Sequence, residues 1–136
     1  MSKLLKIIIA AVVVLVTGVA AYIFLLSPQQ PAEAQEKPMY TYTPGDSFVT
    51  NIKDSTCLLK TTIVLSVDDP DKTEDMDEKQ QIIRDIIIST LREKTEDELR
   101  SMDIQDKLRV EIVKNIKEKL DMEYLVTLYF NDFVLQ

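Results

Sequence analysis

An uninterrupted apolar run occupies residues 7–26. At about 1.5 Å per residue, a helix of this length measures about 30 Å, which matches the hydrocarbon thickness of a bilayer. A buried core helix would usually be shorter and would carry a polar face, whereas only Thr17 and Gly18 interrupt the apolar side chains here. The run therefore predicts a membrane-spanning helix that contacts lipid. Its start, middle and end are Ile7, Leu15 and Leu26.

The charges beside this run predict its orientation. Lys3 and Lys6 precede it, whereas residues 27–35 contain no Lys or Arg, and positive charge is retained on the cytoplasmic side. We therefore expect residues 1–6 in the cytoplasm and the chain after the run outside it. A cleavable signal peptide is the alternative, because Ala32-Glu33-Ala34 has the form of a cleavage site. Against it, the apolar run exceeds the usual signal-peptide core and ends well before that motif.

Composition limits what the rest of the chain can be. Residues 27–136 hold 14 basic and 23 acidic residues, a formal charge of −9, which argues against nucleic acid and against flat docking onto anionic lipid. Residues 27–38 carry three prolines and no large apolar side chain, so we expect a linker there. Residues 39–136 suffice for one small domain. The lone Cys57 cannot form an intramolecular disulfide, so packing must hold this domain together.

The clearest strand of the domain is predicted at residues 57–67, where apolar side chains alternate. The face expected in the core consists of Leu59, Thr61, Ile63, Leu65 and Val67. Shorter strand signals occupy residues 39–42 and 48–52, on either side of a Pro-Gly-Asp turn, and these two pieces could pair with each other.

A helix is predicted after an acidic segment. Residues 68–77 lack the glycine and the closing glutamate of an EF-hand, so we expect a solvated loop rather than a calcium site. Asp77, with Gln80 three positions later, predicts the start of a helix that continues to about Lys94. Its expected apolar face consists of Ile82, Ile83, Ile86, Ile87 and Leu91.

One apolar residue of this helix falls outside that face. Ile88 lies on the side that also carries Arg84 and Arg92. Single exposed apolar residues are ordinary, but an isoleucine between two arginines is also typical of a contact surface. These three residues are therefore the candidate partner surface.

Two further helices and a last strand complete the domain. Thr95 and Glu98 form a capping-box pattern that predicts a short helix through Met102, and Asp103 begins a longer one whose outer face is Lys and Glu. The buried stripe of the longer helix is expected at Ile104, Leu108, Ile112, Ile116 and Leu120.

The last strand is predicted at residues 124–136. Its first part should place Val126, Leu128 and Phe130 on the face opposite Leu125, Thr127 and Tyr129. Asn131-Asp132 has the composition of a bulge or bend. The order strand, helices, strand predicts an α+β domain with helices on one face of a sheet. If the first and last long strands pair in parallel, their crossover should be right-handed.

The inventory of chemical groups argues against catalysis. The sequence has no histidine, which removes the commonest general base and zinc ligand and leaves Cys57 without a partner to activate it. Its two glycines, Gly18 and Gly45, cannot build a phosphate-binding loop. We therefore expect no catalytic residues, no metal site and no cofactor.

Several segments follow one another along the chain in a recognisable order and spacing. They are Phe48-Val49-x-Asn51-Ile52, Arg84-Asp85-Ile86-Ile87-Ile88-Ser89-x-Leu91, Lys94-Thr95-x-x-Glu98-Leu99, Leu108-Arg109-x-Glu111-Ile112 and Tyr129-Phe130-x-x-Phe133-Val134-x-Gln136. In this order and spacing the chain resembles the FliL family, the flagellar basal-body-associated proteins, and the likeness covers nearly the whole chain. Two departures are Met102-Asp103, where the family often has a glycine, and Leu58-Leu59-Lys60, where it often has an arginine.

The resemblance implies a single-pass protein of the bacterial inner membrane with a periplasmic domain similar to the stomatin-like (SPFH) fold. It further implies self-association into a ring and attachment to flagellar stator proteins of the MotA and MotB type, in support of torque and motility. Two other classes remain open on the residues alone. A membrane-tethered sensor or ligand-binding module would need a concave polar pocket, and a periplasmic enzyme would need clustered carboxylates with shifted pKa values in such a pocket.

Overall fold

The computed structural model describes residues 2–26 and 37–136. These residues belong to two units, one within Met1–Glu36 and one of Lys37–Gln136, and each is described by itself. Residues 27–36, which hold most of the expected linker and the Ala32-Glu33-Ala34 motif, lie outside the described residues.

The first unit contains one helix, α1 (Lys3–Leu26), which begins before the apolar run and ends with it. Its segment Lys3–Phe24 contains an 18-residue window with a mean hydropathy of 2.8, and none of that window is buried. The hydroxyl of Thr17 donates to the carbonyl oxygen of Val13 at 2.9 Å, so this polar group is satisfied within the helix, as a lipid environment requires. Length and composition make α1 a candidate membrane span, with Ile7 and Leu15 exposed along it.

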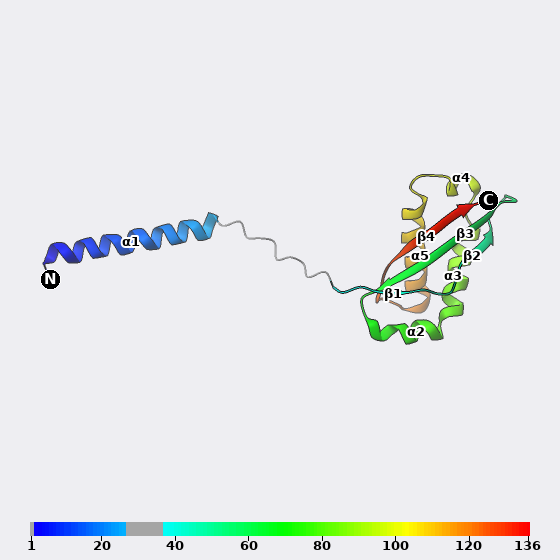
Figure 1. Ribbon diagram of the computed structural model, residues 1–136, viewed down its shortest axis with the longest axis horizontal. Coiled ribbons are helices and arrows are strands. Elements are labelled where there is room, and N and C mark those ends of the chain that lie inside the picture. Colours follow the sequence, from blue (N-terminus) through cyan, green and yellow to red (C-terminus); the bar gives the residue numbers. More distant parts are fainter. Residues whose placement is uncertain (1, 27–36) are drawn as a thin grey trace. The chain divides into compact units, whose positions relative to one another are not determined.

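The second unit is built on a four-stranded antiparallel sheet, seen in Figure 1. Its central strand is β3 (Leu58–Val67), which pairs along nearly its whole length with β4 (Leu125–Leu135). Two short strands, β1 (Tyr40–Tyr42) and β2 (Phe48–Asn51), also pair with β3, at its end and its start respectively. They therefore follow one another along the edge of β3 that β4 leaves free.

This topology differs from two pairings that the sequence left open. The two short strands do not pair with each other, because the ten-residue edge of β3 accommodates both. The long strands are antiparallel rather than parallel, since the helices return the chain to the end of β3 that it left: the Asp68 amide donates to the Tyr124 carbonyl oxygen at 3.1 Å.

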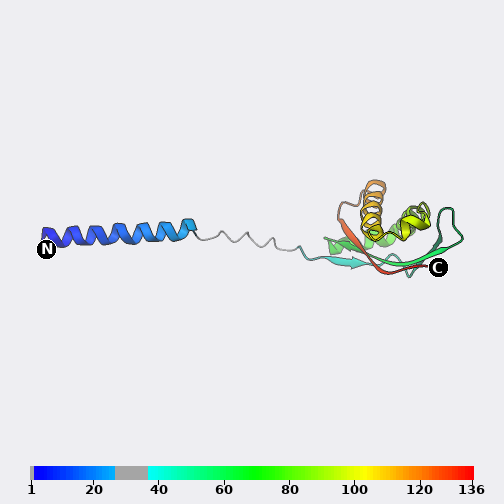
Figure 2. The ribbon, with the colours of Figure 1, turned by 90° about the horizontal axis from the view of Figure 1, so that it is seen from above.

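One face of β3 lies in the core, as its alternation predicts. The buried residues of that face are Leu59, Thr61, Ile63, Leu65 and Val67. Thr61 is the polar member, and its hydroxyl donates to the Asp132 carbonyl oxygen at 2.6 Å. Helices α3 (Gln80–Arg92) and α5 (Ile104–Leu120) lie on the same side of the sheet in Figure 2. The domain is therefore α+β with helices over one sheet face, as predicted.

The acidic segment after β3 is helical, which corrects the prediction of a loop. A 3-10 turn, η1 (Pro70–Lys72), leads into α2 (Thr73–Glu78), and Met76 of α2 is fully buried. Asp77 therefore lies inside a helix and does not cap α3, which begins only after Lys79. Its carboxylate instead accepts a hydrogen bond from the buried Tyr42 hydroxyl at 3.0 Å.

Helix α3 uses most of its predicted apolar face. Ile83, Ile86, Ile87 and Leu91 are buried, but Ile82 is 51% exposed and the prediction for it was wrong. Ile88 is half-buried and packs against the core. The buried face is thus rotated from Ile82 toward Ile88 relative to the expectation.

The two remaining helices begin as predicted. Thr95 and Glu98 form a capping box at the start of α4 (Glu96–Leu99), but α4 ends at Leu99, so its predicted continuation through Met102 was wrong, and Met102 is fully exposed beyond it. In α5, the predicted stripe faces the core, with Leu120 only partly buried. Its fully or nearly fully buried members are Ile104, Leu108, Ile112 and Ile116.

Strand β4 contains two register shifts. One skips Asn131, which confirms the predicted bulge. The other skips Val126, between the pairs Ser66 with Thr127 and Val67 with Leu125. The extra residue changes the alternation, so Val126 is 39% exposed while Leu125 and Leu128 are both buried, contrary to the predicted faces.

Candidate functional site

The structure separates the three α3 residues of the candidate partner surface. The Arg84 guanidinium donates from Nη1 to the Pro44 carbonyl oxygen at 2.9 Å and lies 4.4 Å from the centre of the Phe48 ring. Ile88 packs partly against the core. Arg92, at the end of α3, is exposed. Two of the three side chains therefore support the domain's own packing, and Arg92 is the one that faces solvent.

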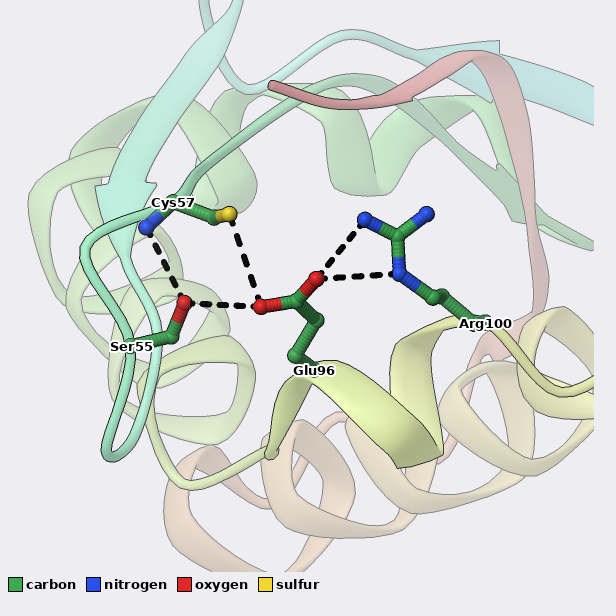
Figure 3. A network of polar contacts seen from close by, with 4 residues as sticks. All are labelled: Ser55, Cys57, Glu96 and Arg100. Atoms are coloured by element: carbon green, nitrogen blue, oxygen red, sulfur yellow. Dashed lines mark hydrogen bonds and ion pairs between the residues drawn. The ribbon is translucent and has the colours of Figure 1, made fainter.

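A polar cluster joins the loop between β2 and β3 to helix α4, as Figure 3 shows. The Glu96 Oε2 atom accepts hydrogen bonds from the Ser55 hydroxyl at 3.0 Å and from the Cys57 thiol at 3.5 Å. Its Oε1 atom accepts from Nε and Nη2 of Arg100 at 3.0 and 2.7 Å. The Ser55 hydroxyl also accepts from the Cys57 amide at 3.0 Å.

The electrostatics of this cluster follow from its donors. The Arg100 guanidinium, followed by the Ser55 hydroxyl and the Cys57 thiol, holds the pKa of Glu96 below its usual value. The backbone adds a second connection beside it, because the Lys53 amide donates to the Lys94 carbonyl oxygen at 2.9 Å. The side-chain donors of Ser55 and Cys57, from the loop, and of Arg100 all reach the Glu96 carboxylate, so the cluster fastens the loop to α4. The Cys57 thiol is half-buried and hydrogen-bonded to Glu96.

The outer side of α5 carries a feature that the sequence analysis missed. Val110 is 69% exposed in the middle of a face that was described as Lys and Glu. It borders two open hollows, of about 560 Å³ toward the start of α5 and about 430 Å³ toward the start of β4. Val113 and Val126 also line the second hollow. The signal was present in the sequence, since at 100° per residue Val110 lies opposite the stripe of buried isoleucines.

Metal ligation finds no support in the described part of the chain. Within residues 2–26 and 37–136, no three side chains of the types His, Cys, Asp or Glu are grouped so that they could hold an ion. The acidic side chains of the α2 region contact tyrosines instead: the Tyr124 hydroxyl donates to Asp75 Oδ2 at 2.6 Å.

Comparison with known proteins identifies the domain. Residues 41–136 match the family described as flagellar basal body-associated protein FliL, which is most of the Lys37–Gln136 unit and more than half of the chain. The chain belongs to the FliL family. The recognition from the sequence segments is thereby confirmed, and the FliL match includes all four strands and helices α2 to α5 except the first residue of β1.

A FliL relative shows the same relationship. The chain is 30% identical over 100 residues to the Flagellar protein FliL of Aquifex aeolicus (strain VF5). The matched region is 72% of this chain and 61% of that relative, so the chain spans less than two thirds of the relative's length. With one candidate membrane helix among the described residues, this FliL-family chain fits a single-pass protein of the inner membrane.

Proposed function

We propose that this protein anchors a non-catalytic FliL domain at the flagellar motor, where the domain assembles around the stator and supports torque and motility. The observation that carries the proposal is the FliL match over residues 41–136 in a chain that also has a candidate membrane helix, α1. A tethered domain of this kind acts by position and contact. Its partners would be stator proteins of the MotA and MotB type and further copies of the same chain.

Tethering gives a physical reason why self-association would take the form of a ring. Copies restricted to one membrane meet at a high effective concentration, so a weak lateral interface can be occupied in the membrane and empty in dilute solution. A head-to-tail interface closes into a ring when its rotation permits. We extend the proposal to a stomatin-like (SPFH) arrangement of the α+β domain.

The proposed topology places residues 1–6 in the cytoplasm, residues 7–26 in the membrane and a linker at residues 27–38, with the domain of residues 39–136 outside the cytoplasm. It is supported by Lys3 and Lys6 before α1. Intact-mass measurement of the membrane fraction tests whether α1 is retained. A dominant species that begins at Gln35 would show that α1 is a cleaved signal.

On α3, Arg92 is the exposed member of the proposed partner surface, whereas Arg84 contacts Pro44 and Ile88 packs against the core. Arg92→Glu should weaken co-localisation with the stator without lowering the stability of the domain, because the side chain is exposed. Unchanged co-localisation would remove Arg92 from the contact.

The decisive experiment separates the domain from its anchor. Residues 1–26 are replaced by a cleavable export signal, so that the domain is secreted at normal expression but is not tethered. We expect motility under load and stator co-localisation to be lost, while a variant with a foreign membrane span keeps both. If the untethered domain fully preserves both, anchored assembly is not how this protein works.

A further inference from the structure

The outer side of α5 carries charges in an order that reverses about its centre. Five residues recur at spacings of three and four and share the side of the helix that faces away from the core. They form the α5 stripe: Asp103, Asp106, Val110, Lys114 and Lys117. Two acids precede the exposed valine and two lysines follow it at the same intervals.

We infer that the α5 stripe is a self-recognition surface on which a second copy of this chain packs its own α5 in the antiparallel sense. Antiparallel packing about Val110 places the acidic end of each stripe against the basic end of the other. The same surface then serves both partners, as in a twofold interface, where a residue near the axis meets its own counterpart. A twofold contact closes at two copies, so it is a second contact beside the head-to-tail contact proposed for the ring, and it rests on the proposed self-association.

The surroundings of Val110 suit an apolar centre for such a contact. The side chain stands between the two hollows of about 560 and 430 Å³, so an opposing helix can seat its side chains on either side of it. Val113 and Val126 extend the apolar area toward β4, and Val126 is exposed there because of the β4 bulge. The charged rim and apolar centre match the usual anatomy of a protein interface.

Charge favours this face over the rest of the domain for contact between copies. Residues 37–136 hold 14 basic and 21 acidic side chains, so two copies repel each other in general. The lining of the two hollows is nearly neutral, with four basic and five acidic residues. These are Lys107, Arg109, Lys114 and Lys117, and Asp103, Asp106, Glu111, Glu118 and Glu123.

The acids of the stripe already have neighbours on their own helix. Lys107 lies 2.7 Å from Asp103, and Arg109 lies 2.6 Å from Asp106. Both acids have exposed side chains, and exposed pairs of this kind stabilise a helix only slightly. A carboxylate can accept more than one donor, so these contacts do not compete with a lysine from a second copy.

The first test uses a single cysteine near the proposed twofold axis. Val110→Cys is introduced in the full chain with Cys57→Ser, and membranes are treated with a mild oxidant. Antiparallel helices in contact bring the two substituted positions within disulfide range. We expect a disulfide-linked dimer. The matched control is Val49→Cys in the same background, a 55% exposed position on β2, which should remain monomeric.

The second test reverses the charges, with Val110→Cys crosslinking as the readout. Asp106→Lys alone or Lys114→Asp alone places like charges opposite each other, and each should lower the crosslinked fraction by about tenfold. The two changes together restore complementarity and should restore crosslinking. A purely structural role for either residue would predict that the double variant is the worst of the three.

The outcomes separate this inference from the proposed function. Amine crosslinking of the unsubstituted protein in membranes reports self-association through any surface. Oligomers in that experiment, with no more crosslinking at Val110→Cys than at Val49→Cys, overturn the α5 interface and leave the proposed function standing. Failure of the charge exchange to restore crosslinking also overturns it. The absence of oligomers in both experiments would contradict self-association itself.

Discussion

The Arg84 guanidinium lies 4.4 Å from the centre of the Phe48 ring and donates to the Pro44 carbonyl oxygen at 2.9 Å. One side chain of α3 thus holds both the turn before β2 and the first residue of that strand. Gly45, in the same turn, has a φ of +112°, and a Cβ built there would lie 2.5 Å from Arg84 Nη1. The turn and the arginine are therefore mutually dependent.

Arg84→Ala should lower the free energy of unfolding of the fragment Lys37–Gln136 by about 1 to 3 kcal/mol, because a charge-assisted hydrogen bond and a cation–π contact are both lost. Denaturant unfolding of the fragment with and without Arg84→Ala measures this loss of free energy. Arg84→Lys keeps the charge and should recover only part of the loss, since an ammonium lacks the planar face that stacks on Phe48. Full recovery by lysine would show that charge alone matters here.

Gly45→Ala should destabilise the same fragment by at least about 1 kcal/mol, because a residue with a Cβ rarely adopts this φ. It should also displace the Arg84 guanidinium. In the Arg84→Ala background the loss should therefore be smaller than in the natural sequence, which a double-mutant cycle detects. Strictly additive losses would mean that the turn does not depend on the arginine.

Most of the regular elements, although not α2, were predictable because a single physical constraint decides each of them. The alternation of residues 57–67 and the stripe from Ile104 to Ile116 follow from burying one face of a strand or helix. The exposure of Val126 was not predictable, because one bulge residue reverses the alternation of a strand and the residue types around Val126 do not indicate a bulge. Similarly, the rotation from Ile82 toward Ile88 depends on how α3 meets the sheet.

The candidate site likewise contains features that the sequence pattern could reveal and features that it could not. Arg84 and Ile88 were selected because they fall outside a predicted apolar face, but their contacts are with distant parts of the chain, at Pro44 and in the core. The polar cluster around Glu96 joins residues about 40 positions apart, so spacing along the sequence could not reveal it. Val110 was accessible to the same periodicity argument that located the buried stripe.

Thr95→Ala should destabilise the domain by about 0.5 to 2 kcal/mol through loss of the capping box of α4. The Glu98 carboxylate accepts from the Thr95 amide at 2.8 Å and from its hydroxyl at 3.0 Å, and these contacts hold the pKa of Glu98 below its usual value. Thermal unfolding measures the loss. Thr95→Ser keeps the hydroxyl, so an equal loss in that variant would assign the effect to the methyl group instead.

Acidification should remove a contribution of Asp75 to stability. The Lys79 ammonium at 2.7 Å and the Tyr124 hydroxyl hold the pKa of Asp75 below its ordinary value in the folded domain. A depressed carboxyl pKa contributes stability that is present above the unfolded value and lost as pH falls through the folded one, here below about pH 4. Below about pH 4, the free energy of unfolding should therefore fall less steeply with decreasing pH in Asp75→Asn than in the natural sequence. The slope for Tyr124→Phe should lie between the two. Identical acid slopes would contradict this.

Ile112 and Val110 provide a matched pair of sites on opposite sides of α5. Ile112 is fully buried in the stripe that meets the sheet, whereas Val110 is 69% exposed. Ile112→Asp should unfold the domain, with a loss above about 4 kcal/mol, because an unpaired charge would enter the core. Val110→Asp, two residues away in the same helix, should change the stability by less than about 0.5 kcal/mol.

Circular dichroism during thermal unfolding of both variants separates core packing from helix propensity, since the two sites receive the same residue. Aspartate is a poor helix former at either position, so a propensity effect would lower both melting temperatures equally. A loss confined to Ile112→Asp follows only if the stripe faces the core. Comparable losses at both sites would mean that Val110 is also covered in the isolated domain.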